Sequence, residues 1–274
     1  MRTTVIDFPG GELEVIDIPG DAGVPPLLVM HGGLGSAQLW NEFLPKLASA
    51  TGCRTVAFSR HGHGWSASPP RRRTPRFMHE EAAEVVPEVV SRLELEGPIL
   101  VGHSDGASIA LIYAADHSVP GLMAIAPHVF VEQICLNEIA RAREQYLFAD
   151  LREKMAPHHK DVDAAFFGWC DAWLDPEFRN WDIRDLVARV RAPLLLIQGI
   201  HDQYGTLAQL DEIARLAPAP VERLHLDCRH APFVQRQDET VAAAARFVAR
   251  LSPRVSLTEL PIQPISSPRA RCFG

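Results

Sequence analysis

The sequence contains 274 residues, a length that suits one large domain or two small ones. Hydrophobic residues make up 47% and charged residues 22%, which is typical of globular proteins and excludes collagen-like or disordered chains. The formal net charge of −7 argues against general affinity for a phosphate backbone, so we expect no nucleic-acid partner.

No apolar run reaches the roughly 18 residues of a membrane-spanning helix, and the opening sequence MRTTVIDFPGGELEV lacks the apolar core of a secretory signal. We therefore expect a cytoplasmic protein without a membrane partner. The cysteines are scattered without a C-x-x-C pair, so we expect reduced thiols and neither a metal nor a cofactor. These cysteines are Cys53, Cys135, Cys170, Cys228 and Cys272.

Strand and helix patterns alternate along most of the chain. Two alternating runs, 3–8 and 12–18, flank Pro9-Gly10-Gly11 and predict an antiparallel hairpin. Continuous apolar runs, typical of strands buried on both faces of a parallel sheet, follow at 27–30, 55–58, 99–101, 122–125 and 193–197, with a weaker run at 221–226. Helical periodicity lies between them at 37–50, 77–95, 106–116, 206–216 and 240–251. This alternation predicts an α/β fold.

Three segments depart from the alternation. Residues 131–183 read as a helical insertion, which divides a core formed by 1–130 and 184–251. Residues 252–274 contain four prolines and little periodicity, so we expect a loose extension. The basic run Arg71–Arg73 with Arg76 is flanked by prolines, and we expect a solvated loop there, with an anion site as the alternative.

The strongest motif is Gly102-His103-Ser104-Asp105-Gly106, which fits G-x-S-x-G between a buried strand and a helix. Such a turn is sharp, and only glycines two positions either side of Ser104 allow it to expose the hydroxyl. The simpler alternative is a serine that merely caps the helix.

A serine nucleophile needs a base that is oriented by a third group. His230 and Asp202 follow the last two predicted strands, where the base and the acid of such folds lie. His201 lies too close to the acid and His225 falls inside a strand, whereas Asp227 remains open as an alternative acid.

Attack on a carbonyl creates an oxyanion, which needs backbone N–H groups aimed at it. The residue after the nucleophile, Asp105, should supply one N–H, and the glycine-rich loop at 31–36 should supply the second. Such a loop could also cradle a nucleotide, but no phosphate-binding glycine motif follows a strand here.

With these motifs together, the chain resembles the α/β-hydrolase superfamily through HGGLGS at 31–36, SRHGHGWS at 59–66, GHSDGA at 102–107, GIHDQYG at 199–205 and CRHAPF at 228–233. The resemblance covers 3–251 and implies an eight-stranded, mostly parallel sheet flanked by helices, with a helical cap inserted after the sixth strand. It also implies Ser104 as nucleophile, His230 as base, Asp202 as acid, and the N–H groups of Gly33 and Asp105 as the oxyanion hole. Ser59 departs from the family, which usually has Asp at this position.

A serine nucleophile favours attack on carbonyl carbon. We expect a hydrolase of small, partly apolar carboxylic esters or lactones that works through an acyl-enzyme. The alternatives are a C–C bond hydrolase of meta-cleavage type and a ligand-binding protein without turnover. Aromatic residues of the insertion could line the substrate pocket or simply bind the cap to the core. The expected pocket residues are Leu34, His103, Phe130, Trp169, Trp173 and Tyr204.

Overall fold

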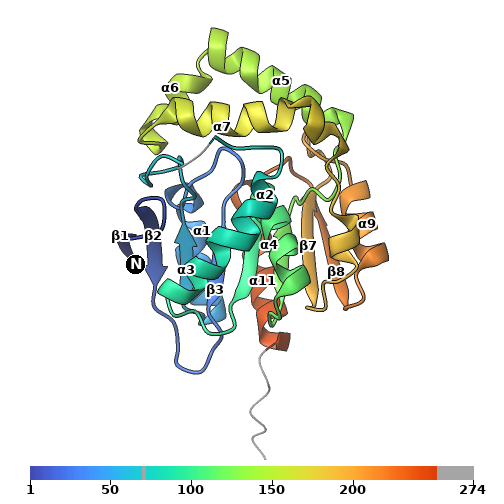
Figure 1. Ribbon diagram of the computed structural model, residues 1–274. Coiled ribbons are helices and arrows are strands. Elements are labelled where there is room, and N and C mark those ends of the chain that lie inside the picture. The colour runs from blue at the N-terminus through green and yellow to red at the C-terminus, as the bar shows by residue number, and fades with distance from the viewer. Residues whose placement is uncertain (70–71, 252–274) are drawn as a thin grey trace, which may run out of the picture.

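A computed structural model describes residues 1–69 and 72–251 (Figure 1). Its centre is one eight-stranded sheet with the order β1-β2-β4-β3-β5-β6-β7-β8. β2 pairs antiparallel with β1 and β4, and the remaining pairs are parallel. This sheet and its flanking helices confirm the predicted fold class. The strands are β1 (Arg2–Ile6), β2 (Leu13–Ile18), β3 (Leu27–Met30), β4 (Thr55–Phe58), β5 (Ile99–His103), β6 (Leu122–Ile125), β7 (Leu194–Gly199) and β8 (Val221–Leu226).

Each face of the sheet packs against its own set of helices. One face packs against 3-10 helix η1 (Gln38–Trp40), α1 (Phe43–Thr51) and α11 (Gln237–Leu251). The other packs against α2 (Phe77–Glu80), π-helix η2 (Glu81–Val85), α3 (Val86–Arg92), α4 (Asp105–Asp116), α8 (Arg184–Val187) and α9 (Ala208–Leu216). The short α10 (Pro232–Gln235) lies between β8 and α11 in the chain.

The two apolar cores explain why the central strands are continuous apolar runs. All four residues of β3 are buried. Leu28 and Met30 belong to the core on the α4 side, whereas Leu27 and Val29 belong to the core on the α1 side. Successive side chains of a strand point to opposite faces, so a sheet covered on both faces requires apolar residues at every position.

Two predicted helices are interrupted. The pattern at 37–50 divides into η1 and α1, with Asn41 between them in the left-handed region at a φ of 42°. Pro45 explains the break, because a residue without an N–H fits only the first turn of a helix. The pattern at 77–95 contains the π-helix η2; the helical segment begins at Phe77 as predicted and ends at Arg92, three residues earlier than predicted.

Apart from α8, the segment between β6 and β7 lies above the carboxyl ends of the strands, where Figure 1 shows α5 and α7 crossing the top of the molecule. Its helices are α5 (Gln133–Phe148), α6 (Leu151–Met155), η3 (Ala156–His158), α7 (Val162–Leu174) and η4 (Pro176–Asn180). None of the helices within residues 1–69 and 72–251 combines the length and apolar character that crossing a membrane requires. The expected extension at 252–274 falls outside the described residues.

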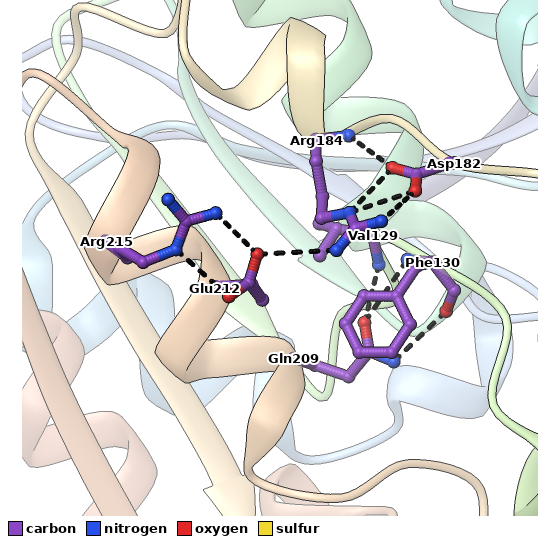
Figure 2. A network of polar contacts seen from close by, with 7 residues as sticks. All are labelled: Val129, Phe130, Asp182, Arg184, Gln209, Glu212 and Arg215. Carbon is purple, nitrogen blue, oxygen red and sulfur yellow. Dashed lines mark hydrogen bonds and ion pairs between the residues drawn. The ribbon is translucent and has the colours of Figure 1, made fainter.

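The chain leaves the core at Val129 and Phe130 and returns to it beside them at Asp182 and Ile183, and we call these four residues the stem (Figure 2). Phe130 and Asp182 form an antiparallel bridge, and the N–H of Ile183 donates to the carbonyl of Val129 at 2.9 Å. The side chain of Gln209 accepts from the N–H of Val129 at 2.7 Å and donates to the carbonyl of Phe130 at 3.1 Å. The outgoing and returning segments are thus hydrogen-bonded to each other, and the outgoing segment is also hydrogen-bonded to α9.

Candidate active site

Ser104 lies in the sharp turn between β5 and α4, with a φ of 52° in the left-handed region. A Cβ on Gly102 would overlap the backbone of Gly106 and Ala107, and a Cβ on Gly106 would overlap the carbonyl of Met30. Both glycines are therefore required by close backbone approach, as the sequence predicts. The strained turn places Ser104 at the carboxyl edge of the sheet.

Ser104, His230 and Asp202 form a continuous series of hydrogen bonds. The Oγ of Ser104 is 3.0 Å from Nε2 of His230, and Nδ1 of His230 is 2.8 Å and 2.9 Å from the carboxylate oxygens of Asp202. Because a carboxylate only accepts, Nδ1 carries the proton and Nε2 is free to accept from the hydroxyl. His230 follows β8 and Asp202 follows β7, so the ends of neighbouring strands bring them together.

Asp202 is almost completely buried, and its carboxylate also accepts from the N–H of Tyr204 at 2.8 Å and from the amide of Gln198 at 3.2 Å. Burial opposes ionisation, but the charge of His230 and the hydrogen bonds from His230 and Tyr204 outweigh it and hold the pKa of Asp202 below its ordinary value. Asp202 is therefore a carboxylate around neutral pH.

The alternative acid and the rival histidines lie elsewhere. Asp227 is exposed and pairs with the exposed His201 at 3.0 Å, and it also faces Arg236. His225 lies inside β8 with its side chain exposed. The structure thus brings Asp202, and not Asp227, to His230.

His103 supports the loop that carries His230. Its Nε2–H donates to the backbone carbonyl of His230 at 2.8 Å, and the two rings are 4.8 Å apart between centroids. Burial and the neighbouring charge of His230 lower the pKa of His103 to about 3, so the ring stays neutral and keeps this donor in place.

Two backbone N–H groups near Ser104 have no partner among the described residues, namely those of Gly33 and Asp105. Asp105 is the first residue of α4, where N–H groups are unsatisfied within the helix and carry the positive end of its dipole. Gly33 lies in the loop after β3, and a Cβ there would overlap the indole of Trp169. Glycine at this position therefore allows α7 to pack directly on the loop.

A cavity of about 300 Å³ opens at Ser104. Leu34, His103, Trp169 and Tyr204, which the sequence analysis places in the pocket, are among its lining residues. The remaining wall comes from residues that the sequence analysis does not single out for binding: Ser36, Leu39, Trp40, Phe233 and Val234. Apart from Ser36, these side chains are apolar and differ little from core residues in sequence, so their signal is weak.

Phe130 and Trp173 do not line this cavity. Phe130 belongs to the stem, where the guanidinium of Arg184 lies 5.2 Å from its ring centroid. Trp173 is fully buried, and its Nε1–H donates to Oδ1 of Asp105 at 3.2 Å. Most aromatic residues of the insertion likewise pack into the core, and burial raises the pKa of the Asp105 carboxyl beneath them.

A buried carboxylate that no sequence pattern indicates lies beside the unusual Ser59. Glu14 of β2 is buried and accepts from the hydroxyl of Ser59 at 2.7 Å, from the amide of Gln38 and from the N–H of Trp65 at 3.2 Å. The Oγ of Ser59 in turn accepts from the N–H of Ala37 at 2.8 Å. A serine plus a glutamate from another strand thus supply the acceptors that one Asp could supply. The alternation of β2 gives no hint of this, because Glu14 occupies a buried position between Leu13 and Val15.

The expectation of a solvated basic loop is wrong for Arg73. Its Nη2 donates to the carbonyl of His61 at 2.8 Å and to Nδ1 of His63 at 2.9 Å. Burial lowers its pKa to about 10, with a further contribution from Arg60. Arg72 remains exposed. One arginine of this segment is therefore directed inward, which composition alone does not reveal.

The family model for the alpha/beta hydrolase fold matches residues 25–184. A proline iminopeptidase of Lactobacillus helveticus is 23% identical over 262 residues, which cover 80% of this chain and 87% of the relative. Protein phosphatase methylesterase 1 of Bos taurus is 34% identical over 118 residues, which cover 42% of this chain and 30% of the relative. The enol-lactonase structure from Burkholderia xenovorans LB400 is similar with a TM-score of 0.71 at 19% identity, covering 90% of this chain and 100% of the other. Because the family model matches residues 25–184 and the sheet has eight strands, the chain belongs to the α/β hydrolase fold family.

Proposed function

We propose that the protein is a serine hydrolase of small, partly apolar carboxylic esters or lactones and works through an acyl-enzyme. The observation that carries the proposal is the hydrogen-bonded series from Ser104 through His230 to Asp202 at the mouth of a cavity. His230 takes the proton of the hydroxyl as Ser104 attacks the carbonyl carbon, and Asp202 stabilises the resulting imidazolium. The N–H groups of Gly33 and Asp105 stabilise the oxyanion.

The cavity supports a small and uncharged substrate. Its volume of about 300 Å³ is at the lower end of the range of roughly 300–1,000 Å³ for ligand pockets. Among its described lining residues there is no Asp, Glu, Lys or Arg. A substrate ammonium, such as the amino terminus of a peptide, would lack a carboxylate there, which favours an ester or lactone over the peptide substrate class suggested by the iminopeptidase name.

The test combines labelling with turnover. A fluorophosphonate probe should add one adduct, located by mass spectrometry on Ser104, and the Ser104→Ala variant should take up none. Steady-state hydrolysis should appear within a panel of p-nitrophenyl esters of varied chain length, lactones and a dienoic ring-cleavage product. An adduct on another serine, or full activity in Ser104→Ala, contradicts the proposed nucleophile. Turnover of the dienoic compound alone contradicts the ester or lactone assignment, and the absence of all turnover favours a binding protein.

A further inference from the structure

Buried basic side chains lie behind the loop that carries Gly33, and the proposed chemistry does not use them. They are His31, Arg60 and His63, each at most 2% exposed. All three make hydrogen bonds to backbone carbonyls of the loop itself. Burying an arginine and two histidines costs free energy, and the hydrogen bonds to the loop offset part of that cost.

The carbonyl of Gly32 receives three donors. Nδ1–H of His31 donates at 2.7 Å, Nη2 of Arg60 at 3.1 Å, and the N–H of Gly35 at 3.1 Å. Nη1 of Arg60 also donates to the carbonyl of His31. The N–H of Arg60 donates to Nε2 of His31 at 3.0 Å, which fixes the tautomer with the proton on Nδ1.

These contacts determine where the next N–H points. In a trans peptide the carbonyl of one residue and the N–H of the next point in opposite directions. No cis peptide occurs within the described residues. Because Arg60 and His31 hold the carbonyl of Gly32 on the buried side, the N–H of Gly33 points to the opposite side. Gly33 lines the cavity that contains Ser104, and its N–H has no other partner in the described chain.

The following peptide is held in the same way. Nε2–H of His63 donates to the carbonyl of Gly33 at 2.8 Å. The opposite ring nitrogen, Nδ1, lies 2.9 Å from Nη2 of Arg73, and an arginine can only donate, so Nδ1 accepts and the proton stays on Nε2. Burial, together with the charge of Arg73, keeps the pKa of His63 well below its usual value, so the ring remains neutral.

We propose that Arg60 and His63 are positioning residues that fix the two peptides on either side of Gly33: Arg60 aims the N–H of Gly33 at the oxyanion through the carbonyl of Gly32, and His63 keeps Gly33 from turning away through the carbonyl that follows it. The inference rests on the proposed function and adds to it the origin of the oxyanion hole's geometry. Electrostatic stabilisation of this kind depends on donors fixed before the reaction begins. Fixed buried hydrogen bonds on consecutive carbonyls of a glycine-rich loop supply that rigidity, which glycines by themselves lack.

The test compares two substitutions of His63 that differ in reach. In His63→Asn the amide keeps an acceptor near Nδ1 for Arg73 but is too short to reach the carbonyl of Gly33. In His63→Gln the amide nitrogen lies near the position of Nε2 and retains the donor. We expect His63→Asn to lose about 10²-fold in kcat with little change in KM, since removing an oxyanion donor costs about 10²–10³-fold. His63→Gln should recover most of this loss.

A second readout separates aiming from general damage. A trifluoromethyl ketone binds as a covalent adduct of the nucleophile that carries an oxyanion, whereas the matching alcohol binds without forming a covalent bond or an oxyanion. In His63→Asn the Ki of the ketone should rise in parallel with the loss of kcat, and that of the alcohol should not change. Arg60→Lys, which keeps the charge but holds fewer carbonyls, should give an intermediate loss with the same pattern.

Three outcomes overturn the inference. They are wild-type kcat in His63→Asn, equal weakening of both inhibitors, or no recovery in His63→Gln when both variants have the thermal stability of wild type. If wild type itself takes no fluorophosphonate on Ser104, the proposed function fails first. If the probe labels Ser104 in wild type and labels both His63 variants as fast as wild type, only the positioning role fails.

Discussion

Replacing Asp202 by Asn keeps the shape of the side chain and removes its charge. Three donors converge on the two carboxylate oxygens, from His230, Tyr204 and Gln198. An asparagine has one acceptor oxygen, and when that oxygen takes the place of Oδ1, which accepts from the N–H of Tyr204, the NH₂ group takes the place of Oδ2, 2.9 Å from Nδ1 of His230. Its NH₂ then faces Nδ1 of His230 and favours the tautomer with the proton on Nε2. In that tautomer the imidazole presents a proton, and no lone pair, to Ser104.

The expected loss is large because both orientation and charge change together. The same substitution lowers kcat about 10⁴-fold in a serine protease triad, which corresponds to about 5.5 kcal/mol of barrier. We expect a loss of this order in kcat for an ester that wild type hydrolyses, measured with enzyme whose thermal unfolding is checked. The fluorophosphonate labelling rate should fall in parallel, since it depends on the same proton transfer.

Asp227→Asn is the matched control. Asp227 pairs with His201 and Arg236 at the surface, where such contacts contribute only about 0–1 kcal/mol. The kcat of Asp227→Asn should stay near that of wild type. Near wild-type turnover in Asp202→Asn, with a strong loss in Asp227→Asn, would refute the assignment of the acid and the geometry on which it is based.

Three further predictions concern stability and reactivity. Folding lowers the pKa of Asp202, so its contribution to stability is complete above the unfolded value of about 4 and is lost as pH falls through the folded pKa. The difference in free energy of unfolding between wild type and Asp202→Asn, measured with urea, should therefore shrink on acidification. A constant difference from pH 6 to about pH 3 would contradict this. Trp173→Phe leaves the buried carboxylate of Asp105 without its indole donor and should lower the free energy of unfolding by about 1–3 kcal/mol, and unchanged denaturant midpoints would show that the contact is unimportant. Burial raises the pKa of Cys170 to about 11, so about one thiol in a thousand is ionised at pH 8. Alkylation of Cys170, located by mass spectrometry, should therefore be slow until urea unfolds the protein. Rapid labelling of the native protein would contradict the described burial.

The relative positions of Ser104, Asp202 and His230 could be predicted because they follow from topology. Ser104 directly follows β5, Asp202 lies three residues after β7, and His230 lies four residues after β8. The apolar runs of these strands are visible in the sequence, although that of β8 is weaker, and parallel neighbours end at the same edge of the sheet. The connection from strand to helix around Ser104 is likewise fixed by glycines at close backbone contacts. Local patterns therefore suffice where a strand end sets the position of a residue.

The support behind the loop could not be predicted because it joins residues from separate elements. Glu14 of β2 reaches Ser59 and Gln38, and Arg60 reaches back to His31, in contacts with no fixed sequence spacing. The same holds for Trp173, whose spacing in α7 fits a pocket residue and a core residue equally well. Its hydrogen bond to Asp105 decides the matter, and only the assembled fold brings the two together.

The stem gives the fold a consequence for how such chains can diverge. Phe130 and Asp182 are paired, so the residues between them form a loop whose two ends are held together at the core. Doubling the length of such a loop adds only about 0.6 kcal/mol of closure entropy. Segments of different length can therefore be joined to the same stem at small cost in closure entropy, as long as they keep buried contacts such as that of Trp173 with Asp105. Because Trp169 enters the cavity from this loop while Ser104 and His230 come from the core, selectivity can change here while the reacting groups stay in place.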